Sequence, residues 1–127
     1  MDLNQVTVGA RDYEESVAFY RLLGLNQIVD APPRYARFEC ANGATLSIHA
    51  DEAAGGHGCV LYFETEALDE RVKALEAAGL SFLSPPTDQP WLWREARLLD
   101  PAGNELCLYW AGDNRRYPPW RIATDPA

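Results

Sequence analysis

The sequence predicts an α+β domain in which two βαβββ modules form a cup-shaped mixed β-sheet with helices on the outer face. The main observation is an internal repeat in the 127-residue chain. At a shift of 55 residues, 6–8 align with 61–63, and at a shift of 60 residues, 43–49 align with 103–109. Such self-similarity at a fixed period indicates a repeated structural unit. Equivalent positions of the two units are therefore expected to meet around one axis.

The first module is predicted to span residues 3–50. Apolar and polar residues alternate over 4–10, as in a half-buried strand. Asp12 is a typical helix N-cap and Gly24 a typical helix end, so a helix is expected between them. Three strands should follow, around 25–30, 35–40 and 44–50, with breaks at Pro32-Pro33 and Asn42-Gly43.

The second module is predicted to span residues 59–110, after a linker at 51–58 that contains His57. A C-terminal tail at 111–127 completes a single domain. Within this module the sequence predicts strand 59–65, helix 67–78, strand 80–84, a Pro-rich break at 85–90, strand 91–99, turn 100–103 and strand 104–110.

Composition excludes several classes of function. The net charge of −8 disfavours binding to a phosphate backbone, so no nucleic-acid partner is expected. No apolar run is long enough to cross a membrane, and the N-terminus lacks the pattern of a secretion signal. Cys40, Cys59 and Cys107 are odd in number and lack metal-site spacing, which favours free thiols and a cytoplasmic location.

Two motifs carry a resemblance to a known family. The helix segment Ser16-Val17-Ala18-Phe19-Tyr20-x-x-x-Gly24-Leu25 follows the first strand, and Asp100-Pro101-x-Gly103-Asn104 precedes the last strand. With the paired modules, these motifs resemble the vicinal oxygen chelate superfamily over residues 4–110. That group includes glyoxalase I, bleomycin-resistance proteins, extradiol dioxygenases and methylmalonyl-CoA epimerase.

The resemblance implies a divalent metal held in the cup by the first and fourth strands of each module. The matching positions here are Gln5, Ser47, Val60 and Cys107. Valine cannot bind a metal, and the set offers few of the oxygen or nitrogen ligands that such metals prefer. We therefore expect no metal and no cofactor. The alternative is a divalent-metal-dependent lyase, isomerase or dioxygenase with a non-standard ligand set such as Gln5, His49 and Cys107.

The cup is predicted to be rich in aromatic faces, which suit planar or cationic ligands. Its expected lining is Gln5, Thr7, Ser47, His49, Val60, Tyr62, Trp91, Trp93, Cys107 and Tyr109. Trp91 and Trp93 should face the same way if they lie in one strand. The candidate catalytic residues are His49, Glu64 and Cys107, and the candidate anchors for a ligand carboxylate or phosphate are Arg34, Arg37 and Arg94.

Together these observations predict a small-molecule-binding protein of the glyoxalase/bleomycin-resistance type without the usual metal site. A homodimer is expected. The tail carries Trp120 and Ile122, and we expect them to dock on their own domain or on a dimer mate. Two alternatives stay open for the tail: Trp120 or Arg121 closes the cup, or the tail binds a protein partner.

Overall fold

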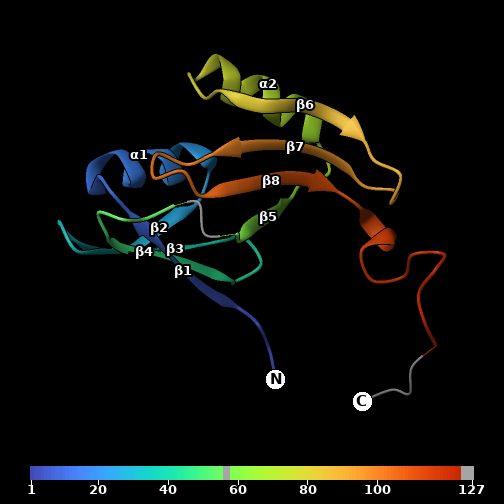
Figure 1. Cartoon of the computed structure of the whole chain (residues 1–127), viewed down its shortest axis with the longest axis horizontal. Helices are drawn as coiled ribbons and strands as arrows, with labels where there is room; N and C mark the ends of the chain where they lie inside the picture. The colour runs from blue at the N-terminus through green and yellow to red at the C-terminus, as the bar shows by residue number, and fades with distance from the viewer. Residues whose placement is uncertain (56–57, 124–127) are drawn as a thin grey trace.

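The computed structural model describes residues 1–55 and 58–123 and contains two βαβββ modules, each with its own four-stranded mixed sheet (Figure 1). His57 lies outside the described residues. Module one consists of β1 (Gln5–Ala10), α1 (Tyr13–Leu23), β2 (Asn26–Ala31), β3 (Tyr35–Glu39) and β4 (Thr45–Ala50). Module two consists of β5 (Val60–Glu64), α2 (Leu68–Ala77), β6 (Phe82–Asp88), β7 (Arg94–Leu99) and β8 (Glu105–Trp110). The predicted α+β class and paired modules are confirmed.

The two sheets share one topology. Their strand orders are β1-β4-β3-β2 and β5-β8-β7-β6. In each sheet the first strand pairs parallel with the fourth, and the other neighbours are antiparallel. The sequence repeat is therefore a repeat of structure, down to the partner of each strand.

Local signals fix the ends of α1. The side chain of Asp12 accepts a hydrogen bond from the backbone N–H of Glu15 at 3.0 Å, which satisfies one otherwise unpaired donor of the first turn. Gly24 ends the helix with φ 108°, a left-handed conformation that favours glycine. α1 packs on β3 and β4, and α2 packs on β6, β7 and β8. Among the described residues, neither helix has the length and apolar composition needed to cross a bilayer.

The Asp100–Asn104 turn joins module two to module one. Asp100 is buried and accepts a hydrogen bond from the hydroxyl of Tyr20 on α1 at 2.6 Å. The Asn104 amide donates to the carbonyl oxygen of Gly9 on β1 at 3.0 Å. Gly55 lies so close to this turn that a Cβ there would sit 1.9 Å from the carbonyl oxygen of Ala102. The turn motif therefore holds the two modules together, and Figure 1 shows the β7–β8 turn beside α1.

Two boundaries in module two differ from the prediction. The predicted break at 85–90 is wrong, because β6 continues through Pro85 and Pro86 to Asp88. β6 is an edge strand, where a proline without an N–H can be accommodated, and its register shifts between Ser84 and Thr87. β7 begins at Arg94 rather than at residue 91.

The expected strand alternation of Trp91 and Trp93 is consequently wrong. The segment before β7 forms a turn, and Leu92 has a φ of 70° in the left-handed region. A turn does not alternate its side chains like a strand, so tertiary contacts decide where the two tryptophans lie.

The tail leaves β8 through a short 3-10 helix, η1 (Gly112–Asn114), and then runs away from the sheets (Figure 1). Trp120 is 57% exposed and Ile122 is 76% exposed. The expectation that these side chains dock on their own domain is wrong. Docking on a dimer mate stays a prediction.

Candidate functional site

In each sheet, one face packs against the helix of its module and the other carries the candidate site residues. In module one, Phe38, Leu46 and Ile48 belong to the buried core. Their strand neighbours point to the opposite face because side chains alternate along a strand. That face carries Gln5 and Thr7 from β1, Tyr35 and Arg37 from β3, and Thr45, Ser47 and His49 from β4.

Hydrogen bonds connect the polar residues on this face of module one. The amide nitrogen of Gln5 donates to the hydroxyl oxygen of buried Ser47 at 3.0 Å, and Gln5 also accepts from Thr45. The hydroxyls of Ser47 and Tyr35 are 2.5 Å apart, and the Nε of Arg37 donates to Tyr35 at 2.9 Å. The hydrogen bond with Ser47 lowers the pKa of Tyr35; burial opposes this shift, and Arg37 reinforces it.

The equivalent face of module two carries a cluster of three aromatic rings, Tyr62, Trp93 and Tyr109, which we call the aromatic wall. Trp93 stacks on Tyr109 with ring centroids 4.7 Å apart and an interplanar angle of 19°. Tyr62 meets both rings edge-on, at 5.9 Å from Trp93 and 5.6 Å from Tyr109. The indole N–H of Trp93 donates to the carbonyl oxygen of Asn114 at 3.3 Å. Tyr62 is 46% exposed, so the wall presents ring surface to solvent.

A network of charged side chains borders the aromatic wall. Arg97 forms ion pairs with Glu105 at 2.6 Å and with Glu95 at 3.1 Å, and it donates to the Tyr62 hydroxyl at 3.4 Å. Burial works against the charge of Arg97, but its hydrogen bonds with Glu105 and Glu95 raise its pKa overall. The indole N–H of Trp91 donates to Glu95 at 2.7 Å. This contact keeps Trp91 beside the wall even though it lies outside β7.

The four family-equivalent positions do not suit a divalent metal. The amide of Gln5 and the hydroxyl of Ser47 are already engaged with each other and with Thr45 and Tyr35. Val60 offers no donor atom. Cys107 is fully buried, and burial first, then the charge of Glu95, raises its pKa to about 12, so it is a thiol at neutral pH. The described residues contain no group of three or more His, Cys, Asp and Glu side chains placed to hold a metal.

The other candidate residues lie apart from this network or have structural partners. His49 is exposed, and its Nδ1 lies 3.2 Å from the carbonyl oxygen of Ala50. Glu64 accepts hydrogen bonds from the backbone N–H groups of Ala111 and Gly112, at 3.0 and 3.1 Å, which fixes the end of β8. Arg94 forms ion pairs with Asp69 and Asp88, and these pairs raise its pKa. Arg34 is exposed in the turn before β3.

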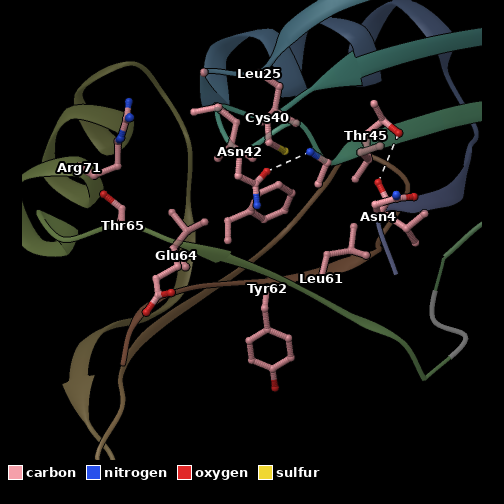
Figure 2. Close-up of a pocket in the computed structure, with 18 of the residues that line it drawn as sticks. Asn4, Leu25, Cys40, Asn42, Thr45, Leu61, Tyr62, Glu64, Thr65 and Arg71 are labelled. Carbon is pink, nitrogen blue, oxygen red and sulfur yellow. Dashed lines mark hydrogen bonds between the residues drawn. The ribbon is translucent and has the colours of Figure 1, made fainter. Parts of the chain in front are cut away.

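The structure also contains a groove of about 840 Å³ between the modules. Of the predicted cup residues, Gln5, Val60 and Tyr62 contribute to its lining. Figure 2 shows the Leu61 side chain and the Tyr62 ring projecting from opposite sides of β5, so Tyr62 borders the groove while its ring lies on the other side. The groove and the aromatic wall therefore lie on opposite sides of β5.

The structure thus brings the predicted residues together as two groups on two sheets. Gln5 and Ser47 are joined in module one, while Val60 packs with Cys107 in module two. That all four surround one hollow stays a prediction. Sequence reasoning missed Tyr35, Thr45, Glu95 and Arg97. The 60-residue shift contained a usable signal, because it aligns Arg37 with Arg97 and Tyr35 with Glu95.

Two βαβββ modules with helices on one side of each sheet define the class of vicinal oxygen chelate folds. The sequence model of the Glyoxalase/Bleomycin resistance protein/Dioxygenase superfamily matches residues 2–108. The chain belongs to this superfamily. No curated protein matches the chain.

Solved structures with the same fold differ in their described activities. An enzyme of the glyoxalase/bleomycin resistance protein/dioxygenase family from Burkholderia phytofirmans PsJN is 25% identical, covering 87% of this chain and 99% of its own, with a TM-score of 0.73. A lactoylglutathione lyase from Agrobacterium tumefaciens is 21% identical, covering 86% and 92%, with a TM-score of 0.69. A bleomycin-binding protein complexed with bleomycin is 20% identical, covering 87% and 98%, with a TM-score of 0.69. The last two likenesses, below 25% identity, show the fold alone.

Proposed function

We propose that this chain is a small-molecule-binding protein that holds a flat, aromatic or cationic ligand on the aromatic wall and needs no metal. The observation that carries the proposal is the partly exposed cluster of Tyr62, Trp93 and Tyr109. Aromatic faces bind planar rings by offset stacking and bind cations through the negative potential of the ring face. The bleomycin-binding relative gives a precedent for ligand binding on this fold.

Charge beside the wall favours a cationic ligand over an anionic one. Arg97 faces two carboxylates, Glu95 and Glu105, which leaves this trio with one net negative charge. Glu64 adds a further carboxylate at the end of β5. A cation over the wall would gain both the ring potential and this Coulomb attraction.

The unsuitable donor set at positions 5, 47, 60 and 107 supports binding without a metal. The hydrogen-bonded amide and hydroxyls would have to exchange their present partners before they could bind an ion. The buried thiol would have to lose its proton against the cost of burying a charge. A cytoplasmic location and a homodimer stay predictions, the latter tested by light scattering on the purified protein.

The test combines metal analysis with ligand titration. Protein purified without chelator is analysed for metals, and N-methylquinolinium and neutral naphthalene-2-ol are titrated while the indole N–H resonance of Trp93 is followed by NMR. We expect less than stoichiometric metal and a saturable shift of Trp93 that is larger for the cation. Trp93→Leu should weaken binding at least about tenfold, or about 1.4 kcal/mol. Trp120→Leu removes an exposed tryptophan from the tail and serves as the matched control.

A tightly bound stoichiometric metal would overturn the metal-independent part of this proposal. Unchanged affinity in Trp93→Leu, with the variant's fold verified by circular dichroism, would overturn the role of the aromatic wall. If Trp120→Leu weakened ligand binding as much as Trp93→Leu does, the ligand would bind at the tail instead of at the aromatic wall.

A further inference from the structure

The repeat places an arginine at the same position in both modules, but the two arginines have different partners. Arg37 lies opposite Ser47 on β4, and Arg97 lies opposite Cys107 on β8. Arg97 is neutralised within the chain by Glu95 and Glu105, at 3.1 and 2.6 Å. Module two therefore demonstrates which ligand this position of the fold accepts: a pair of carboxylates that occupy both Nη groups of the arginine.

Module one lacks those carboxylates. Tyr35 lies opposite His49 just as Glu95 lies opposite Tyr109, so Tyr35 takes the place of Glu95. On β4, Thr45 takes the place of Glu105, since both lie beside the first residue of the neighbouring parallel strand. Two hydroxyl side chains thus replace two acids. Neither can neutralise a guanidinium.

The guanidinium of Arg37 is nevertheless held in place. Its Nε donates to the Tyr35 hydroxyl at 2.9 Å, and its Cζ lies 5.4 Å from the centre of the Tyr35 ring. Behind the tyrosine, Ser47 and Gln5 continue the hydrogen bonds into the sheet. This fixation uses the Nε alone, so the planar pair of Nη groups keeps its donors for a ligand.

No carboxylate of the described part of the chain occupies that pair. Glu39, two residues along β3, instead accepts a hydrogen bond from the Asn26 amide at 2.8 Å. Among residues 1–55 and 58–123, ion pairs within 4.0 Å join Arg94 and Arg97 to acids, but none joins Arg37. Arg37 is therefore a half-buried, fixed guanidinium with no anion partner among the described residues, although the chain has a net charge of −8.

We propose that Arg37, fixed by Tyr35, is a binding site for the carboxylate of a small organic acid on the open face of module one. The two Nη groups match a carboxylate in the bidentate geometry that arginine favours. The inference deepens the proposed function by adding a carboxylate to the ligand's chemistry. Its residues lie on β3 and β4, whereas the aromatic wall lies in module two.

The probes are benzoate and its neutral counterpart benzamide, titrated into the full-length protein. The Nε–H resonance of Arg37 reports this site, and the indole N–H of Trp93 reports the aromatic wall. We expect benzoate to shift the Arg37 resonance saturably and benzamide to leave it unchanged. A shift at Trp93 without one at Arg37 overturns this inference and leaves the proposed function standing. A benzoate shift at Arg37, together with no shift at Trp93 when N-methylquinolinium is added, does the reverse.

Three variants sharpen the test. Arg37→Gln should weaken benzoate binding at least about tenfold. Tyr35→Glu supplies an internal carboxylate of the kind seen beside Arg97, so it should weaken benzoate binding to a similar extent. Arg21→Gln removes the same charge from α1, on the other side of the sheet, and should leave binding within about twofold. Equal loss in Arg21→Gln, or unchanged affinity in Arg37→Gln, overturns the site. Inorganic phosphate that binds as tightly as benzoate overturns the assignment to a carboxylate.

Discussion

Replacing Asp100 by alanine should destabilise the protein through a single buried carboxylate that connects the two modules. Asp100 is 5% exposed and accepts four hydrogen bonds. Two come from the backbone N–H groups of Ala102 and Asn104, at 2.9 Å each. The others come from the Asn104 amide at 2.8 Å and the Tyr20 hydroxyl at 2.6 Å. Asp100→Ala removes all four acceptor contacts at once.

The expected loss follows from what each donor can do afterwards. Tyr20 is fully buried, so its hydroxyl would be left without an acceptor at a cost of about 1–3 kcal/mol. The donors of Asn104 are only partly buried and can form hydrogen bonds with water instead, which lowers their contribution to the loss of stability. Losing the charge also relieves the cost of burying it. We therefore expect the free energy of unfolding to fall by about 3–4 kcal/mol.

Urea unfolding followed by circular dichroism measures this loss, with an unchanged m-value as the sign of an intact two-state transition. Tyr20→Phe removes one of the four contacts and should cost about 1–2 kcal/mol. The double variant should cost less than the sum of the two single variants, because they share one hydrogen bond. Asp113→Ala, in the 3-10 helix after β8, is the control and should stay within about 0.5 kcal/mol. A loss below about 1 kcal/mol in Asp100→Ala, or strictly additive costs, would refute the reasoning.

Further predictions concern the thiols, alkaline pH and metals. At pH 8 a thiol reagent should label exposed Cys59 in the native protein but Cys107 only after unfolding, because burial raises the pKa of Cys107 to about 12. Mass spectrometry maps the labelled cysteines, and rapid labelling of Cys107 in the native protein would contradict this prediction. The pKa of Cys107 is higher in the folded state, so the unfolded state loses this proton first as the pH rises. The free energy of unfolding should therefore fall above about pH 9, by at most ~1.4 kcal/mol per pH unit from this group. In Cys107→Ser the urea midpoint should fall less over the same pH range. Val60→His should bind no stoichiometric zinc by calorimetry, because Gln5 and Ser47 stay hydrogen-bonded to each other. Tight one-to-one binding would contradict the conclusion that the other three positions do not suit a metal.

The fold was predictable from the sequence because its signals are local and occur twice. Asp12 and Gly24 mark a helix by satisfying its terminal backbone groups, a need that depends on few distant residues. Because the sequence repeats, the helix and strands assigned in one module also predict those of the other module. Asn42-Gly43 similarly marks a turn before β4, and Gly43 has a φ of 89°.

The errors arise where tertiary context decides the local structure. Pro85 and Pro86 are typical of a break, yet an edge strand accommodates them because its outer N–H groups need no partner. Trp91 continues an apolar segment that resembles a strand, yet the left-handed Leu92 turns the chain before β7 begins. Neither outcome can be recognised without knowing which strand lies next to which.

The polar network was harder to predict because it depends on register across three strands. Gln5, Ser47 and Tyr35 come from β1, β4 and β3, and their contact requires that all three strands be aligned to the residue. A one-residue slip would send a side chain to the other face. The sequence could identify the positions of a site, but only the register identifies which hydroxyl meets which guanidinium.

The two equivalent arginines should differ in stability in the way their partners differ. Arg97→Gln would leave Glu95, which is 3% exposed, without its cationic partner and with the Trp91 indole and the Cys107 thiol as neutral partners, and should lower the free energy of unfolding by about 2–4 kcal/mol. Arg37→Gln removes one hydrogen bond and one ring contact but leaves no buried charge unpaired, so the free energy of unfolding should fall by about 0.5–1 kcal/mol. Urea unfolding of both variants measures the difference. Equal losses would mean that Arg37 has a structural role equal to that of Arg97, whereas a small loss at Arg37 leaves its fixed guanidinium to be explained by something that the chain binds.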